Sequence, residues 1–330
     1  MPSYSGVWTL PAQMQAAGTY NWPGAYPPAT STAGFISGGN LVDSSKTALI
    51  QYFDISTLGS SYDFGNLLAA GSSGTSCGSS TRGIIAANVE TGDVQTNVIQ
   101  YITYATRSNA TDFGDMQQQS NGISSCASST RGVMCGSNDT PTNTIQYITI
   151  ASTGNAATFG QMNVEARLQG NGSCASTTRG IFAGGVRNGS LSYATNISYI
   201  TIASTGNATV FGNLTTPSRY NSMASNSTRG IHCVGDTGGS ITSAMYYITI
   251  ATTGNGTLFG NLSTDSWGSA SVTSSTRNVI AVGASSYSAP VALSTLVYVT
   301  IATTGNPTSF GSLSTASWFT AGASNSHGGL

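Results

Sequence analysis

The sequence carries very little charge. Only 6% of its 330 residues are Asp, Glu, Lys or Arg, the formal net charge is −1, and Lys46 is the sole lysine. In soluble domains about a quarter of the residues are usually charged. The ten Lys and Arg residues are scattered and cannot build a basic surface. We therefore do not expect nucleic acid as a partner.

Long apolar runs are missing as well. No stretch approaches the run of about eighteen apolar residues that a membrane-spanning helix needs, so membrane insertion is not expected. Residues 1–10 lack the basic region and the apolar region of a secretory signal peptide, and the sequence predicts none.

Groups for catalysis or metal binding are equally scarce. The chain has two histidines, of which we expect His232 to be a core residue and His327 a turn residue. Its eleven carboxylates are scattered and offer no convergent acid–base pair. No Cys-x-x-Cys pattern, serine nucleophile motif or phosphate-binding loop is present. The sequence therefore predicts no enzyme, no catalytic residue, no metal site and no cofactor.

What the sequence has instead is an internal repeat with a period of about fifty residues. In each of six copies, a tyrosine is followed twelve residues later by Phe-Gly. The pairs are Tyr52/Phe64, Tyr101/Phe113, Tyr147/Phe159, Tyr199/Phe211, Tyr247/Phe259 and Tyr298/Phe310. Because the spacing never varies, we expect these phenylalanines to pack between neighbouring units.

Each copy predicts four short antiparallel strands. In one copy they fall within residues 214–229, 231–235, 245–251 and 258–262, where β-branched and apolar runs alternate with Gly-, Ser- and Asn-rich turns. A lone four-stranded sheet cannot cover both of its faces, but copies stacked around an axis can. The sequence therefore predicts an all-β fold, a six-bladed β-propeller with four-stranded blades.

The ends of the repeat array predict how the ring closes. Residues 316–327 resemble the first strand of the preceding copy, residues 265–277, and no second strand follows them. The first copy lacks a first strand, because the stretch upstream, 21–28, contains three prolines. We expect residues 316–327 to complete the first blade of a propeller spanning 33–330, with residues 1–32 as an arm outside it.

One loop differs between the copies. The interval from the repeat's arginine to the next tyrosine, which contains the loop between the second and third strands, varies from 16 to 21 residues. These variable loops are residues 88–93, 137–141, 186–190, 236–240 and 284–290. In repeat proteins such variation often marks the binding face. The candidate ligand-binding residues on these loops are Asp93, Asp139, Arg187, Asn188, Asp236 and Tyr287.

Two further sets of residues recur at equivalent positions. The arginines are Arg82, Arg131, Arg179, Arg229 and Arg277, and the cysteines are Cys77, Cys126, Cys135, Cys174 and Cys233. We expect each guanidinium to bind backbone carbonyls of its own or the next blade, the alternative being a ring of anion sites. We expect the cysteines to be buried and free, although a Cys126–Cys135 disulfide within one hairpin remains open.

The repeat also resembles a known family. Segments 36–39 and 182–185 end in Gly-Gly, segment 51–54 carries Tyr and Asp, and segment 64–67 places Phe and Leu in the outer strand. This arrangement is similar to the Kelch repeat family of β-propellers. The sequence departs from that family consistently, since Tyr-Ile-Thr-Ile replaces the Tyr-Asp strand and Phe-Gly replaces its Trp.

The whole unit, represented by residues 199–214, also resembles repeats found in bacteriophage virion proteins labelled as tail or fibre components. The resemblance implies a structural protein of the virion, assembled in the host cytoplasm. It would be tail- or fibre-associated or a capsid decoration, and its partners would be other virion proteins. The arm would dock on a neighbouring virion protein through buried aromatic anchors. The candidate anchors are Trp8, Tyr20, Trp22 and Tyr26.

Two other functions remain as alternatives. A carbohydrate-binding propeller would use the variable loops to bind host-surface glycans. It overlaps with the first interpretation if the protein is a receptor-binding fibre. An enzyme built on a propeller is the third, and the lack of a recognisable catalytic set argues against it.

Overall fold

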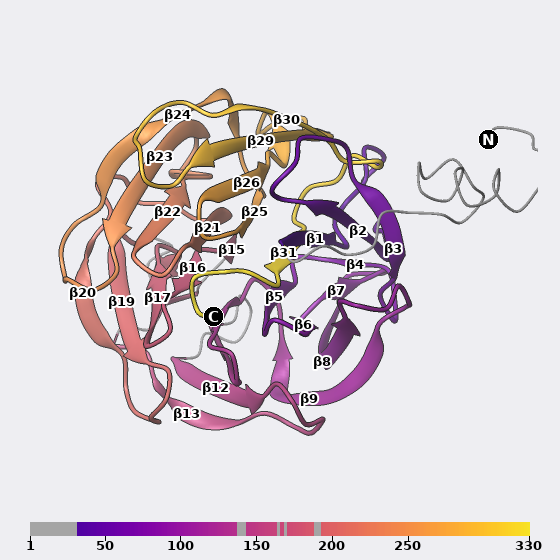
Figure 1. Ribbon diagram of the computed structural model, residues 1–330, viewed down its shortest axis with the longest axis vertical. Coiled ribbons are helices and arrows are strands. Elements are labelled where there is room, and N and C mark those ends of the chain that lie inside the picture. Colours follow the sequence, from indigo (N-terminus) through magenta and orange to yellow (C-terminus); the bar gives the residue numbers. More distant parts are fainter. Residues whose placement is uncertain (1–31, 137–142, 164–165, 168–169, 188–192) are drawn as a thin grey trace, which may run out of the picture.

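The six copies form six antiparallel four-stranded sheets arranged in a ring (Figure 1). The computed structural model describes residues 32–136, 143–163, 166–167, 170–187 and 193–330. The predicted fold class, an all-β, six-bladed β-propeller, is confirmed. No helix in the described part of the chain is long and apolar enough to cross a membrane.

The first three blades are given from the axis outward. Blade 1 contains β31 (Ala321–Ser324), β1 (Ala33–Ser37), β2 (Leu49–Asp54) and β3 (Tyr62–Asn66). Blade 2 contains β5 (Thr75–Gly78), β6 (Arg82–Ala86), β8 (Val94–Thr103) and β9 (Thr111–Ser120). Blade 3 contains β10 (Ser124–Ala127), β11 (Arg131–Cys135), β12 (Thr144–Thr149) and β13 (Ala157–Gln161).

The other three blades follow the same order. Blade 4 contains β16 (Ser173–Ala175), β17 (Arg179–Ala183), β19 (Asn196–Thr201) and β20 (Thr209–Asn213). Blade 5 contains β21 (Asn221–Ser225), β22 (Arg229–Cys233), β23 (Thr242–Thr249) and β24 (Thr257–Ser266). Blade 6 contains β25 (Ala270–Thr273), β26 (Arg277–Ala281), β29 (Thr295–Thr300) and β30 (Thr308–Ser312).

Short strands lie in the connections between these elements. They are β4 (Gly71–Ser72), β7 (Val89–Glu90), β14 (Ala166–Arg167), β15 (Gly170–Asn171), β18 (Val186–Arg187), β27 (Ala284–Ser285) and β28 (Val291–Ala292). Three pairs, β4 with β7, β14 with β18 and β27 with β28, add antiparallel two-residue ladders outside the main strands of the blades.

The C-terminal strand closes the ring. β31 pairs antiparallel with β1, with Gly34 opposite Ser324 and Ser37 opposite Ala321. The predicted closure by residues 316–327 is thereby confirmed, although the strand itself is shorter and begins at Ala321. β31 occupies the inner position of the first blade, next to the axis (Figure 1).

The Phe-Gly phenylalanines form the core between blades. Phe211 is 3% exposed and belongs to a hydrophobic cluster with Ile181 of its own blade and with Ile248 and Ile250 of the next. The equivalent phenylalanines in the other blades are equally buried. The prediction that these rings pack between blades is confirmed.

The glycine of Phe-Gly serves a contact between neighbouring blades. A Cβ on Gly212 would collide with the carbonyl oxygen of Gly254, which lies in the turn between the two outer strands of the next blade. That turn is fixed by two hydrogen bonds. The Gly254 N–H donates to the Phe211 carbonyl at 3.0 Å, and the Asn255 Oδ1 accepts from the Asn213 N–H at 2.9 Å. These contacts, here called the interblade latch, explain why the Tyr to Phe-Gly spacing is fixed.

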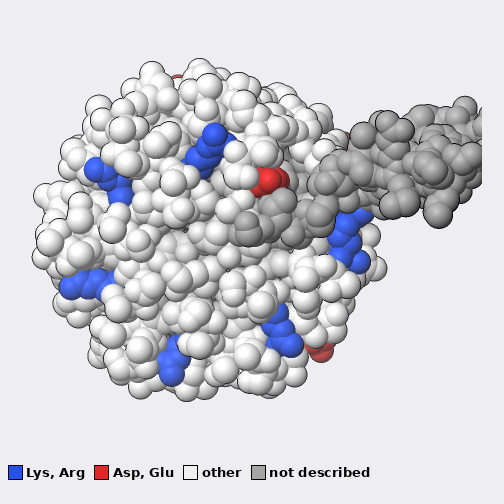
Figure 2. Space-filling view, in the orientation of Figure 1, with Lys and Arg blue, Asp and Glu red and all other residues white. Residues whose placement is uncertain are grey.

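The repeated arginines also join blades. The Arg179 Nη1 donates to the carbonyls of Ile250 and Ala251 at 2.9 and 2.8 Å, and its guanidinium lies 4.7 Å from the ring centre of Tyr199. Equivalent contacts are made by Arg82, Arg131, Arg229 and Arg277. The structural interpretation of these arginines is confirmed. Figure 2 shows Lys and Arg side chains set apart around the face in view, with mostly uncharged surface between them.

The cysteines are all free and buried, as predicted, and the disulfide that was left open between Cys126 and Cys135 does not form. A Cβ on Gly180 would collide with the Cys126 Sγ, and one on Gly230 would approach the Cys174 Sγ to 2.8 Å. The sulfurs of Cys126 and Cys174 therefore fill the space left by a glycine on the next blade. Burial raises the pKa of Cys174 to about 12, so this thiol stays protonated.

Candidate functional site

One face of the ring collects the variable loops. In blades 5, 6 and 1, the segment that leads into the inner strand forms a bridge with the variable loop, pairing Arg219 with Asp236, Trp267 with Ala284 and Trp318 with Asn40. We call this side the loop face. Its described segments include 38–47, 67–74, 87–95, 121–123, 184–187, 193–195, 214–220, 234–241, 263–269, 282–294 and 313–320. The variable loops and the segments that lead into the inner strands emerge on the same side of the ring, because each blade is an antiparallel meander.

A belt of backbone hydrogen bonds runs around the axis at this face. The Gly268 N–H donates to the Tyr220 carbonyl at 3.0 Å, the Phe319 N–H to Gly268 at 2.9 Å and the Ser73 N–H to Phe319 at 2.9 Å. The belt requires left-handed backbone, with φ of 52° at Tyr220, 63° at Gly268, 56° at Phe319 and 57° at Ser73. This conformation suits glycine, and for a bulky residue it is an outlier that the surroundings must enforce.

Five aromatic residues meet at the belt, and we call them the aromatic arc. They are Tyr220, Trp267, Tyr287, Trp318 and Phe319. Ring centres lie 4.7 Å apart for Tyr220 and Phe319, 4.8 Å for Trp267 and Trp318, 4.4 Å for Trp318 and Phe319, and 5.1 Å for Trp267 and Tyr287. The indoles are buried, at 7% exposed for Trp267 and 9% for Trp318, whereas Tyr287 is 41% exposed. The arc therefore presents tyrosine to solvent over a buried tryptophan layer.

Arg219 lies beside the arc and is held from all sides. Its Nε donates to the Asp236 Oδ2 at 2.7 Å, and its Nη2 donates to the Tyr287 hydroxyl at 3.0 Å. The guanidinium carbon is 4.9 Å from the ring centre of Tyr193 and 4.7 Å from that of Tyr220. An arginine between two aromatic rings gains cation–π attraction, and its charge is paired with a carboxylate.

Asp236 is buried beneath this arginine. Besides Arg219, its carboxylate accepts hydrogen bonds from the Tyr193 hydroxyl at 3.0 Å and from the Gly238 N–H at 2.9 Å. Burial alone would raise the pKa of Asp236, but the hydrogen bonds from Gly238, Arg219, Gly239 and Tyr193 outweigh it and hold the pKa below its usual value. Burial and the bond to this carboxylate raise the pKa of Tyr193 to about 12. The group is therefore a neutral ion pair over the ordinary pH range.

The predicted ligand-binding residues lie in different environments, and some of them lie outside the described residues. Tyr287 is exposed within the arc, whereas the Asp236 side chain points inward and positions Arg219 rather than meeting solvent. Asp93 is exposed and forms an ion pair with Lys46 at 2.7 Å between the loops of blades 1 and 2. Arg187 belongs to β18, and its side chain is not described. Asp139, Asn188 and the arm residues Trp8, Tyr20, Trp22 and Tyr26 lie outside the described residues.

Sequence reasoning missed most of the site. The missed residues are Tyr193, Arg219, Tyr220, Trp267, Trp318 and Phe319. A signal was present in the sequence. Ser-Trp occurs at the same place in the last two copies, and Ser-Arg-Tyr replaces it in the copy before. Bulky residues at positions where other copies have small ones mark a departure from the repeat that its own packing does not require.

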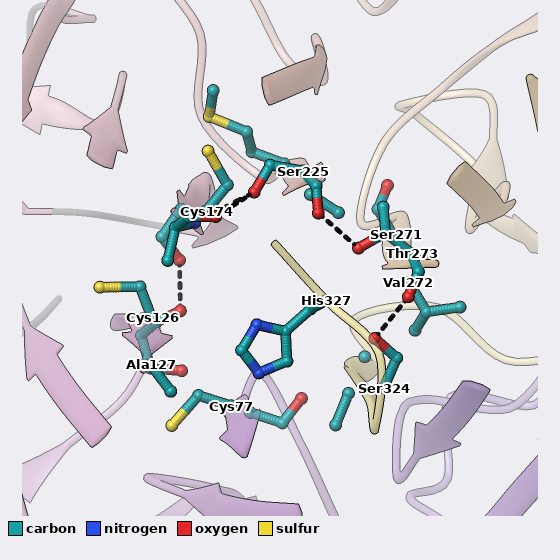
Figure 3. A pocket seen from close by; sticks show the side chains of 18 of the residues that line it. Cys77, Cys126, Ala127, Cys174, Ser225, Ser271, Val272, Thr273, Ser324 and His327 are labelled. Atoms are coloured by element: carbon teal, nitrogen blue, oxygen red, sulfur yellow. Dashed lines mark hydrogen bonds between the residues drawn. The ribbon is translucent and has the colours of Figure 1, made fainter. Parts of the chain in front are cut away.

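The axis of the ring holds a separate cavity of about 60 Å³, which is lined by inner-strand residues (Figure 3). Hydroxyl groups link successive inner strands around it. Ser225 donates to the Ala175 carbonyl at 2.7 Å, Thr273 to Ser225 at 2.8 Å and Ser324 to Thr273 at 2.7 Å. A polar cavity of this size has room for ordered water.

His327 points into this cavity, as Figure 3 shows. His327 lies in a turn, as the sequence predicted, since the Leu330 N–H donates to its carbonyl at 3.1 Å, but the sequence did not predict that its side chain enters the cavity. Its Nε2 donates to the Gly78 carbonyl at 2.8 Å, and its Nδ1 accepts from the Gly329 N–H at 3.1 Å. Burial lowers the pKa of His327. The imidazole is thus neutral and used on both sides, and it fixes residues 325–330 over one end of the cavity.

No group of three His, Cys, Asp or Glu side chains that could hold a metal ion occurs within the described ranges. His232, the other histidine, is 1% exposed in β22, as predicted for a core residue. Neither a family model nor a curated protein matches the chain.

Proposed function

We propose that this propeller is a structural, non-enzymatic component of a bacteriophage particle, either tail- or fibre-associated or decorating the capsid. It would be Kelch-like in its repeats and would assemble with other virion proteins in the host cytoplasm. It would also contribute to attachment at the host surface through its loop face. The similarity of its repeat unit to those of phage virion proteins is the starting point.

The proposal is based on one observation: the repeated residues join neighbouring blades, whereas the residues that differ between blades lie in the loops. Phe211, Gly212, Asn255 and Arg179, with their equivalents, all bind the adjacent blade. The repeat therefore builds a rigid ring. What differs from blade to blade gathers on the loop face, where a partner can be recognised without disturbing the ring.

Attachment to a glycan is the second candidate function, and the aromatic arc favours it. Exposed tyrosine beside hydroxyl-rich loops is typical of surfaces that bind polar ligands with aromatic contacts. In a receptor-binding fibre the two functions would be one.

The virion role is tested on particles. An antibody against the propeller, used in immunogold electron microscopy of purified particles of the encoding phage, should label one defined position. A variant lacking residues 1–31 should fold but fail to be incorporated, because the arm is proposed to dock on a neighbouring protein. Purified particles that lack the protein, with normal infectivity after deletion of its coding region, would refute the proposal.

A further inference from the structure

Tyr287 is the exposed side chain of the aromatic arc that is best placed to contact a ligand. Its ring is 41% exposed, yet it is fixed in place. Trp267 lies beneath it with ring centres 5.1 Å apart and planes inclined at 36°, and Arg219 donates to its hydroxyl at 3.0 Å. An exposed aromatic ring held by packing and by a hydrogen bond loses little freedom when a ligand covers it.

The loop that carries Tyr287 is equally constrained. Ser286 has a left-handed backbone with φ of 62°, its carbonyl accepts from the Trp267 Nε1 at 3.2 Å, and its Oγ accepts from the Ala289 N–H at 3.4 Å. β27 and β28 pair at the base of the loop, Ala284 opposite Ala292. Ser286 and Ser288, the residues before and after Tyr287 in the sequence, are exposed, and their hydroxyl groups can donate and accept hydrogen bonds.

Charge at this place is balanced. The cation bonded to Tyr287 is the Arg219 guanidinium. Its carboxylate partner, Asp236, is fully buried, and the Arg219 Nε lies 2.7 Å from the Asp236 Oδ2. A ligand over Tyr287 therefore meets an ion pair whose charges cancel, and among the described residues no other charged group is hydrogen-bonded to Tyr287. Aromatic surface with flanking hydroxyls and no net charge suits a ligand that is itself neutral and polyhydroxylated.

We infer that Tyr287, with the serines beside it, is a binding site for a neutral saccharide. The apolar C–H face of one pyranose ring would pack on the tyrosine, and its hydroxyl groups would exchange hydrogen bonds with the loop. Trp267 and Arg219 position the tyrosine without touching the sugar. A stable protein–protein interface needs about 800 Å² from each partner, whereas Tyr287 is the one ring of the aromatic arc that is more than about 40% exposed, with Tyr220 and Phe319 only partly exposed beside it. This inference deepens the attachment part of the proposed function.

The test uses the full chain on a printed array of neutral hexose and N-acetylhexosamine oligosaccharides beside sialylated and sulfated ones. We expect binding to at least one neutral structure. Tyr287→Ala should weaken that binding roughly tenfold or more, the factor that corresponds to about 1.4 kcal/mol. Tyr62→Ala is the matched control, because Tyr62 is 39% exposed and lies on the outer strand of blade 1, and it should bind as the unmodified protein does.

Arg219→Lys gives a second readout. A lysine cannot reproduce the planar contact with two tyrosine rings and the bond to the Tyr287 hydroxyl. It should weaken binding while leaving unchanged the tryptophan emission maximum, to which buried Trp267 and Trp318 contribute. No binding to any neutral saccharide, binding to anionic glycans alone, or equal binding by Tyr287→Ala would overturn the inference. If Tyr287→Ala instead left glycan binding intact and blocked incorporation into particles, the site would be a protein-docking surface.

The two proposals fail separately. A chain present in particles that binds no neutral saccharide would refute the site and leave the virion role standing. A chain that binds saccharide through Tyr287 but is absent from particles would refute the virion role alone.

Discussion

The interblade latch leads us to expect that a substitution at Gly212 destabilises the fold. Substitution by alanine would place a methyl group against the Gly254 carbonyl of the next blade. The backbone of Gly212 itself does not need left-handed freedom, so the effect is steric. To relieve the collision, the turn must move away from the outer strand. That movement strains the Gly254 bond to Phe211 and the Asn255 bond to Asn213.

The magnitude follows from these two effects. Overpacking by one methyl group costs about 1–3 kcal/mol, and a weakened hydrogen bond costs about 0.5–1.5 kcal/mol. We expect Gly212→Ala to lower the free energy of unfolding by about 2–4 kcal/mol. With an unfolding entropy of about 2.1 cal/mol/K per residue over residues 33–330, that loss lowers the Tm by about 3–6 °C.

Equilibrium urea denaturation and calorimetry measure both quantities. Gly254→Ala is the control, because nothing lies within 4 Å of a Cβ built on Gly254, although its carbonyl belongs to the same contact. The control should change stability by less than about 1 kcal/mol, as expected for an exposed Gly→Ala change at a permitted conformation. If both variants lost the same stability, the close approach of turn and strand would not be what requires glycine in Phe-Gly.

Three further predictions concern packing and titration. Phe211→Ala should lower the free energy of unfolding by about 3–5 kcal/mol in urea denaturation, as a large-to-small change at an interblade position; Val210→Ala, exposed one residue earlier, is the control. Gly329→Ala should release the last residues, because its methyl group would collide with the Ala127 carbonyl, and faster carboxypeptidase digestion would report it. Burial lowers the pKa of His232 to about 3 in the folded chain, so the unfolded chain binds more protons below about pH 6.5. Stability should then fall as the pH drops from about 6.5 towards 3, by up to about 1.4 kcal/mol per pH unit. His232→Phe, which copies Phe182 of blade 4, should make this fall shallower, and an unchanged slope would contradict the reasoning.

The fold could be predicted because six copies of the repeat show the same residues at the same spacing. A single tyrosine or phenylalanine in a short apolar run is ambiguous, but the constant interval between Tyr199 and Phe211 and their equivalents required a fixed pair of strands. The structure adds the reason, since the turn between these strands binds the neighbouring blade through Asn255. Ring closure was predictable for the same cause, because residues 316–327 match a strand whose partner is found only at the other end of the repeat.

The site could be predicted only in part, because it depends on exceptions to the repeat. Tyr287 was found from the variable length of its loop. Asp236 was found in the same way, but the bridge between Arg219 and Asp236 turns its carboxylate inward, and loop length carries no information about that. Tyr220 and Phe319 are 99 residues apart and meet only because blades 5 and 1 flank the small Gly268 of blade 6. Their contact needs the ring before it can be inferred.

The loop face keeps strain that the ring does not need. Ser73, Gly122 and Gly268 adopt left-handed backbone just before the inner strands begin. Glycine tolerates this conformation better than any other residue. Tyr220 and Phe319 adopt the same conformation with bulky side chains, at a cost of about 1–3 kcal/mol each. The belt itself uses only backbone groups at these two places, so its hydrogen bonds do not explain the aromatic rings. What they add is support for Trp267, which in turn supports Tyr287. The strain is therefore attached to the one exposed ring for which we propose a ligand.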